Sequence, residues 1–271
     1  MKQVAIRFGR HADMIGVLAL PSGPTLVVKR ALLVWNTGIS HRIGPQRMNV
    51  EIAQQLTAHG LPVFRFDLSG RGDSSATEGA IQSAVLDVQE AMDYLSAQYG
   101  YEEFILHGLC SGAIEAHYVA AADKRVVGLS MIDTYSYRVG NYYWHYLKKR
   151  ICSKQAWTRL FRRFQGPKTS NQQQAIDQFF VPFPNIEILK TDYAAFAKRR
   201  MPCLVVFTNG YEHIFNYAGQ FQDMLKGIDL TPILTLHHHS GADHLCTIIG
   251  QRERILDRLS LWIESNYLSP I

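Results

Sequence analysis

One short stretch of the chain combines a reactive side chain with a tight turn. Residues 108–112 (GLCSG) place Cys110 midway between two glycines. The apolar run at 104–107 predicts a strand before this stretch, and the small residues at 113–122 predict a helix after it. A sharp strand-to-helix turn presents its central side chain and leaves little room beside it, which favours flanking glycines. The start of the helix favours negative charge, and this suits a thiolate nucleophile at Cys110.

Ser111 offers a second nucleophilic side chain in the same turn. The glycines are symmetric about Cys110, so we expect Cys110 to be the nucleophile. Ser111 is then better placed to give its backbone N–H to an oxyanion. The alternative interpretation is a buried cysteine in a glycine-rich turn with no chemical role.

The elements around this turn alternate between strand and helix patterns. Such alternation predicts an α/β fold with a mostly parallel sheet covered by helices on both faces. An antiparallel lead-in hairpin is expected at residues 3–7 and 15–20. Strands are predicted over residues 31–35, 62–66, 104–107, 126–132, 203–207 and 231–236, and helices over 48–58, 84–95, 113–122 and 247–262.

Residues 134–200 interrupt the alternation and are rich in aromatic and basic side chains. Residues 134–176 contain no Asp or Glu but nine Lys and Arg, so this segment carries a charge of +9 and the rest of the chain −4, which gives the net charge of +5. We expect a helical lid over 134–200, inserted into a core formed by residues 1–133 and 201–271. An acidic partner should bind the basic lid, although cations that simply face water are the alternative.

The bulk composition is that of an ordered protein with reduced thiols. The 271 residues are 47% hydrophobic and 19% charged, which is enough to bury a substantial core. The N-terminal residues are too charged for a signal peptide, and no apolar run reaches the roughly 18 residues that cross a bilayer. We therefore expect a cytoplasmic protein without a transmembrane segment. The cysteines show neither paired nor zinc-type spacing: Cys110, Cys152, Cys203 and Cys246.

Several motifs together resemble the α/β-hydrolase superfamily over nearly the whole chain. Residues 32–38 (LLVWNTG) resemble its oxyanion strand and loop, and residues 66–74 (FDLSGRGDS) its D-x-x-G-x-G-x-S stretch. Residues 241–244 (GADH) resemble the segment that carries its catalytic histidine. The chain looks like the serine-aminopeptidase and thioesterase branch, with cysteine in place of serine in the nucleophile elbow. Residues 130–135 (SMIDTY) are similar to thioesterase domains that release polyketide and peptide products.

The resemblance implies a catalytic triad in the family's chain order. Cys110 would be the nucleophile, His244 the general base and Asp133 the acid that orients the imidazole. The commoner family acid follows a later strand, where Glu212 is one position away from the usual place, so Glu212 is the alternative acid. Asp133 capping the next helix, and His244 as a plain loop residue, are the structural alternatives.

The resemblance also implies oxyanion and substrate contacts. The oxyanion hole would combine the Ser111 N–H with an N–H from the turn at Gly38 and Ile39. We expect Asp67 and Asp73 to order the turn near the site, and His107 to be structural or a pocket wall. Side chains expected to contact substrate are Arg42, Tyr135 and Trp144, with solvated loop charge as the alternative for Arg42.

Metal and cofactor chemistry are not favoured. In an extended strand only His237 and His239 of residues 237–239 (HHH) share a face, and no further residue with ligand spacing joins them. We expect no metal and no cofactor. The enzyme motifs also argue against nucleic acid as the partner of the basic segment.

These observations favour an enzyme that forms an acyl-enzyme intermediate. The first hypothesis is a thioesterase or acyltransferase acting on an acyl-thioester, with an acidic acyl-carrier protein docking on the basic lid. The second is a carboxylesterase or lactone hydrolase with the same triad. A proline-releasing aminopeptidase is less favoured because residues 134–176 of the lid have no acid to hold a free amine. The contrasting hypothesis is a catalytically silent binding protein of the same fold.

Overall fold

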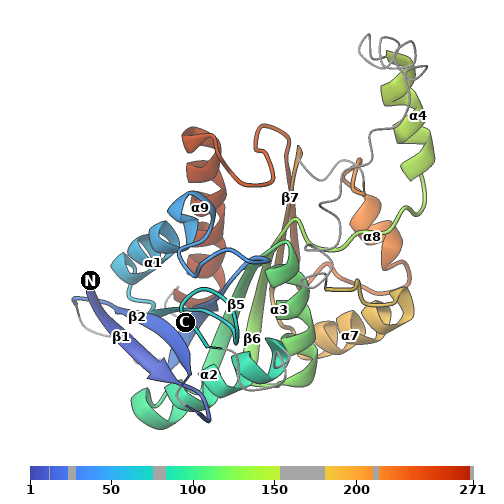
Figure 1. The fold of residues 1–271 in the computed structure, drawn as a ribbon. Coiled ribbons are helices and arrows are strands. Elements are labelled where there is room, and N and C mark those ends of the chain that lie inside the picture. The colour runs from blue at the N-terminus through green and yellow to red at the C-terminus, as the bar shows by residue number, and fades with distance from the viewer. Residues whose placement is uncertain (12, 24–28, 76–83, 153–180, 210–213, 269–271) are drawn as a thin grey trace.

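The computed structural model describes residues 1–271 except 12, 24–28, 76–83, 153–180, 210–213 and 269–271 (Figure 1). Its described part contains an eight-stranded sheet in the order β1-β2-β4-β3-β5-β6-β7-β8. The first two strands pair antiparallel, β2 pairs antiparallel with β4, and all later neighbours are parallel. The strands are β1 Lys2–Phe8, β2 Met14–Leu20, β3 Arg30–Val34, β4 Val63–Phe66, β5 Glu103–Leu109, β6 Val126–Ile132, β7 Cys203–Thr208 and β8 Leu234–His239.

Alternate residues of the parallel strands pack on opposite faces of the sheet, as strand geometry requires. In β5, Phe104 and Leu106 belong to the larger apolar cluster, whereas Ile105 belongs to the smaller one. In β7, Val205 and Val206 divide in the same way. Both faces of the sheet are therefore buried against apolar side chains, which confirms the predicted sheet with helices on each side.

Two helical layers cover these faces (Figure 1). On one face, α1 Met48–Ala58 and α9 Ile249–Ile263 enclose the smaller cluster. On the other face, α2 Ala84–Tyr99, α3 Ser111–Ala122, α7 Ile186–Lys198 and α8 Gln220–Met224 enclose the larger cluster. Within the described residues, no helix combines the length and apolarity needed to cross a membrane.

The predicted insertion contains two described helices with different surroundings. α4 Tyr142–Cys152 stands away from the sheet (Figure 1), and the Tyr143 and Trp144 side chains are both 64% exposed. α7 instead buries Tyr193 and Phe196 in the larger cluster. The division into core and lid stays a prediction, and α7 packs against the sheet layer.

Element bounds follow the sequence patterns closely. The helix over 48–58 and the strand over 126–132 have the predicted limits. The strand predicted at 231–236 begins three residues later, because the Asp229 carboxylate accepts a hydrogen bond from the Thr231 N–H and holds a turn there. The patterns did not predict α7 or α8.

Candidate active site

The turn between β5 and α3 depends on two glycines. Cys110 occupies this turn with φ 54° and ψ −119°, a conformation that ordinary side chains rarely adopt. A Cβ on Gly108 would lie 2.3 Å from the carbonyl oxygen of Gly112, and a Cβ on Gly112 would lie 2.9 Å from that of Asn36. The glycines are therefore needed because the turn packs against itself and against the loop after β3.

Cys110 and Asp133 lie just past the ends of adjacent strands. The Cys110 N–H donates to the Ile132 carbonyl at 2.9 Å, and the Asp133 N–H donates to the Val206 carbonyl at 2.8 Å. Asp133 also has a positive φ, 48°. Such conformations cost about 1–3 kcal/mol each and cluster at functional sites. The sheet thus holds two strained residues side by side at its carboxyl edge.

The Asp133 carboxylate is fully buried and aimed by neighbouring donors. The Thr208 N–H donates to Oδ1 at 2.6 Å, and the Thr208 hydroxyl donates to Oδ2 at 2.5 Å. The same Oδ2 lies 2.8 Å from His244 Nδ1. Thr208, at the end of β7, therefore positions the acid against the imidazole.

His244 is hydrogen-bonded on two sides. Hydrogen bonds to Asp133 and to Cys110 raise the pKa of His244 to about 10, against the opposing effect of burial. Because Nδ1 faces Asp133, Nε2 is the nitrogen left for the sulfur. The imidazole is therefore protonated at neutral pH and lies in hydrogen-bond contact with Cys110. This is the arrangement that makes a thiol nucleophilic.

The loop carrying His244 is fixed by its neighbours. The Asp243 carboxylate accepts hydrogen bonds from the Leu245 N–H at 3.0 Å and the Thr247 hydroxyl at 2.6 Å. The Asn209 N–H donates to the Ala242 carbonyl at 2.9 Å and joins the loop to the end of β7. The hydrogen bonds from Thr247 and Leu245 lower the pKa of Asp243. The residues immediately before and after His244 are thus both fixed by hydrogen bonds.

The predicted oxyanion residues lie on both sides of the elbow. Ser111 begins α3, so its N–H has no carbonyl one helical turn earlier to bond. The Gly38 N–H donates to the Ser111 side-chain oxygen at 2.8 Å. Ile39, the neighbouring candidate, has a side chain that is 74% exposed. Ser111 and Gly38 are therefore hydrogen-bonded through the Ser111 hydroxyl, a contact that the sequence patterns did not predict.

The loop after β3 is anchored to Asp67, as predicted for an ordering residue. Asp67 Oδ1 accepts hydrogen bonds from the Asn36 side-chain amide and the Arg42 N–H, both at 2.7 Å. A Cβ on Gly72 would lie 2.4 Å from the Asp67 carboxyl carbon. The Ser74 hydroxyl donates to the Asp67 carbonyl at 2.7 Å. These contacts explain the spacing of the D-x-x-G-x-G-x-S stretch.

Arg42 is engaged by carboxylates. Its guanidinium contacts Asp67 and Asp73, and its side chain is only 13% exposed. These contacts raise the pKa of Arg42 although burial opposes them, and hydrogen bonds from His41 and Arg42 lower the pKa of Asp73. This placement favours a structural role for Arg42 over the predicted substrate contact. His41, Asp67 and Asp73 cluster closely, but Arg42 already supplies their cation.

The other predicted substrate residues lie apart from each other. Tyr135 is fully buried, and its hydroxyl lies 2.9 Å from both His117 Nδ1 and the Tyr193 hydroxyl. This favours a packing role over the predicted substrate contact. Trp144 is exposed on α4, and its contact with substrate stays a prediction. Glu212, the alternative acid, lies outside the described residues.

His107 is a buried, neutral histidine, consistent with the structural interpretation. Its Nδ1 lies 2.9 Å from the Ser130 hydroxyl oxygen, on the neighbouring strand. Burial lowers the pKa of His107 to about 4. The imidazole therefore joins β5 to β6 without taking up a proton at neutral pH.

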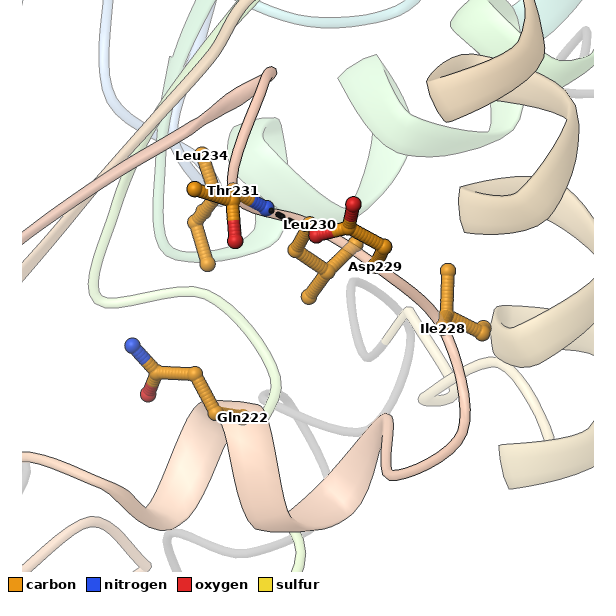
Figure 2. Close-up of a pocket in the computed structure, with 6 residues that line it drawn as sticks. All are labelled: Gln222, Ile228, Asp229, Leu230, Thr231 and Leu234. Atoms are coloured by element: carbon orange, nitrogen blue, oxygen red, sulfur yellow. Dashed lines mark hydrogen bonds between the residues drawn. The ribbon is translucent and has the colours of Figure 1, made fainter.

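Two surface hollows in the described structure lie elsewhere. Figure 2 shows the first, with the Asp229 carboxylate bonded to the Thr231 N–H at its wall. The second lies between α1 and α9 and is lined by Glu51 and Arg252, among others. No triad residue lines either hollow, so neither hollow is part of the candidate active site.

Comparison with known proteins identifies the architecture. No protein-family model and no curated protein matches the sequence. An esterase domain from a Rhodothermus marinus protein is 18% identical, with a TM-score of 0.58 and 99% of each chain covered. The chain has the α/β-hydrolase fold.

Two further solved structures support this fold. An α/β serine hydrolase without a lid from Xanthomonas campestris is 15% identical, with a TM-score of 0.59, covering 98% of this chain and 95% of that chain. A proline iminopeptidase from Mycobacterium smegmatis is 17% identical, with a TM-score of 0.58, covering 97% and 98%. The α/β-hydrolase fold hosts many reactions, so the function must be argued from the site.

Proposed function

We propose that the protein is a cysteine-dependent α/β-hydrolase that forms an acyl-enzyme at Cys110. The observation that carries this proposal is that His244 is hydrogen-bonded both to Asp133 and to Cys110. A cysteine on a strained turn, an imidazole and a buried carboxylate in this order are the parts that nucleophilic acyl transfer requires.

In the proposed reaction, the Cys110 thiolate attacks the carbonyl carbon of the substrate and forms a C–S bond. The carbonyl electrons move to oxygen, where backbone donors at the elbow stabilise the negative charge. As the oxyanion collapses, the bond to the leaving group breaks, and the leaving atom takes the proton from His244 Nε2. Water or another acceptor then gives a proton to His244 and attacks the acyl-thioester, which releases Cys110.

An acyl-thioester is the substrate class that best fits a thiol nucleophile. Exchange of one thioester for another changes the bond energies little, whereas attack of a thiol on an amide is uphill. The enzyme is then a thioesterase if water accepts the acyl group, or an acyltransferase if an amine or alcohol does. A carboxylesterase or lactone hydrolase with the same triad is the second candidate, because the same three side chains can form an acyl-enzyme from an ester.

We also propose the predicted lid as the docking face for an acidic acyl-carrier protein. Between residues 134 and 152 the chain has four basic residues and no acidic one. On α4, Lys148 and Trp144 are exposed together. Opposite charge speeds encounter between such surfaces, and aromatic side chains supply contact area.

The test is the mass of the intact protein after brief mixing with acyl-thioesters of graded chain length. We expect the native protein to gain one acyl group and the Cys110→Ala variant to gain none. Cys203→Ala is the matched control, because burial raises the pKa of that thiol to about 12 and it should not react. This control should acylate like the native protein.

A chase then separates the two thioester reactions. Release of free acid in buffer alone identifies a thioesterase, and faster loss of the adduct on adding an amine identifies an acyltransferase. Absence of both adduct and turnover with every thioester and ester would overturn the proposed function and leave a binding protein of this fold.

A further inference from the structure

The side chain of Ser111 is hydrogen-bonded to one of the backbone groups expected to bind an oxyanion, the Gly38 N–H. Its oxygen accepts the Gly38 N–H at 2.8 Å, so this N–H is already engaged. We propose that the Ser111 hydroxyl is itself an oxyanion donor, acting beside the Ser111 N–H and aligned by Gly38. This inference rests on the proposed acyl-enzyme function.

The hydrogen-bonding capacity of a hydroxyl supports this role. A serine hydroxyl has one proton to donate and two lone pairs that accept. Gly38 uses one lone pair, and among the described residues no protein group accepts the Ser111 proton. Accepting a hydrogen bond polarises the O–H and makes it a stronger donor. The proton is therefore free for an oxygen that becomes negative.

The location of Ser111 also fits. It is the first residue of α3 and follows Cys110 directly, so its N–H and its hydroxyl both lie at the helix end that favours negative charge. Only 8% of the residue is exposed. A donor that is shielded from water stabilises an oxyanion more strongly than one in solvent.

The loop that aligns the hydroxyl is held in advance. The Thr37 hydroxyl donates to the Leu109 carbonyl at 3.1 Å, which joins the loop to the end of β5. The Thr37 N–H donates to the Ser40 hydroxyl oxygen, also at 3.1 Å. Gly38 follows Thr37 and is therefore fixed relative to the elbow. Donors that need no rearrangement during the reaction give the largest catalytic benefit.

A competing arrangement makes the opposite prediction. If the Ser111 side chain rotated away during the reaction, the Gly38 N–H would bond the oxyanion directly. The hydroxyl would then compete with the oxyanion for that N–H. Removing the hydroxyl would slow acylation if Ser111 is a donor, but leave it unchanged or faster if Ser111 is only a competitor.

The experiment measures single-turnover acylation of Cys110 in the native protein, Ser111→Ala and Ser111→Thr. We expect Ser111→Ala to acylate about 10²–10³-fold more slowly, the range for loss of one oxyanion donor, with substrate affinity unchanged. Ser111→Thr keeps the hydroxyl and should recover most of this rate. Reaction of Cys110 with methyl methanethiosulfonate creates no carbonyl oxyanion, so its rate should be equal in all three proteins.

The outcomes are distinguishable. Ser111→Ala acylation as fast as native or faster would overturn the donor role and leave the proposed function standing. A slow methanethiosulfonate reaction in Ser111→Ala would also overturn it, because the damage would then lie in the nucleophile. No acylation of the native protein by any ester or thioester would overturn both proposals.

Discussion

Replacing Asp133 with asparagine isolates the electrostatic contribution of the buried acid. The side chain keeps its size, and its amide oxygen can still accept the Thr208 N–H at the Oδ1 position. The amide nitrogen then replaces Oδ2, which in the native protein accepts from both the Thr208 hydroxyl and His244. A donor at this position turns the imidazole to the tautomer that has its proton on Nε2. Nε2 can then no longer take the thiol proton.

The size of the effect follows from the pKa of His244. The native pKa of about 10 is maintained first by the hydrogen bond to Asp133, and the ordinary value is 6.5. At pH 8 the native imidazole is almost fully protonated. If the pKa falls to the ordinary value, the protonated fraction at pH 8 drops to about 3%. The same exchange in a serine protease triad lowers turnover by about 10⁴, and we expect a loss of this order.

The assay is NMR of labelled histidine, recorded as the pH is raised, together with acylation rates. Asp243→Asn is the matched control, because this carboxylate precedes His244 in the chain but binds Leu245 and Thr247 instead. The control should leave the His244 midpoint unchanged. A native midpoint near 6.5, or an Asp133→Asn midpoint equal to the native one, would refute the reasoning.

Three further predictions concern stability and can be checked by urea unfolding. Gly72→Ala should lower the unfolding free energy by about 2–3 kcal/mol, because the new Cβ would meet Asp67. Gly100 also has a positive φ but has open space around it, so Gly100→Ala should lower the unfolding free energy by only about 1 kcal/mol. Arg42→Gln should lower the unfolding free energy by about 3 kcal/mol, because the buried Asp67 carboxylate loses the cation that it contacts. An unchanged unfolding free energy together with a raised KM would instead support the substrate contact of Arg42. Because the pKa of His107 is lowered to about 4 in the fold, the unfolded state takes up the proton first, and the unfolding free energy should fall by about 3 kcal/mol as the pH falls from 6.5 towards 4. His107→Phe should therefore reduce the acid sensitivity, and an equal pH slope in the variant would contradict this.

The sheet and most of its helices could be predicted because their signals are local. The strand at 126–132 and the helix at 48–58 are read directly from apolar spacing. α7 was missed although it carries a start signal, the Asn185 side chain that accepts the Glu187 N–H at 2.9 Å. Its aromatic and cationic surroundings in the sequence favoured a lid, and only packing shows which face of α7 is buried.

The candidate site was indicated in part by local sequence motifs. The sequence motifs indicated Cys110, Asp133 and His244, and the structure brings these three side chains together. The bond from Gly38 to the Ser111 hydroxyl was not predictable, because it depends on one side-chain rotation and on two segments 73 residues apart. The burial of Tyr135 depends on α7 and was missed with it.

The packing of α7 limits how this protein can diverge or be redesigned. His117 on α3 lies 2.9 Å from the Asp192 carboxylate on α7, and the His117 ring stacks with Tyr193. Residues 186–198 are thus as much a part of the scaffold as the helix that follows the nucleophile. An exchange of the predicted lid between proteins of this fold should therefore keep residues 186–198. It should replace only the part of residues 134–200 that precedes residue 186. Substrate range can then change by loop exchange without the loss of a core helix.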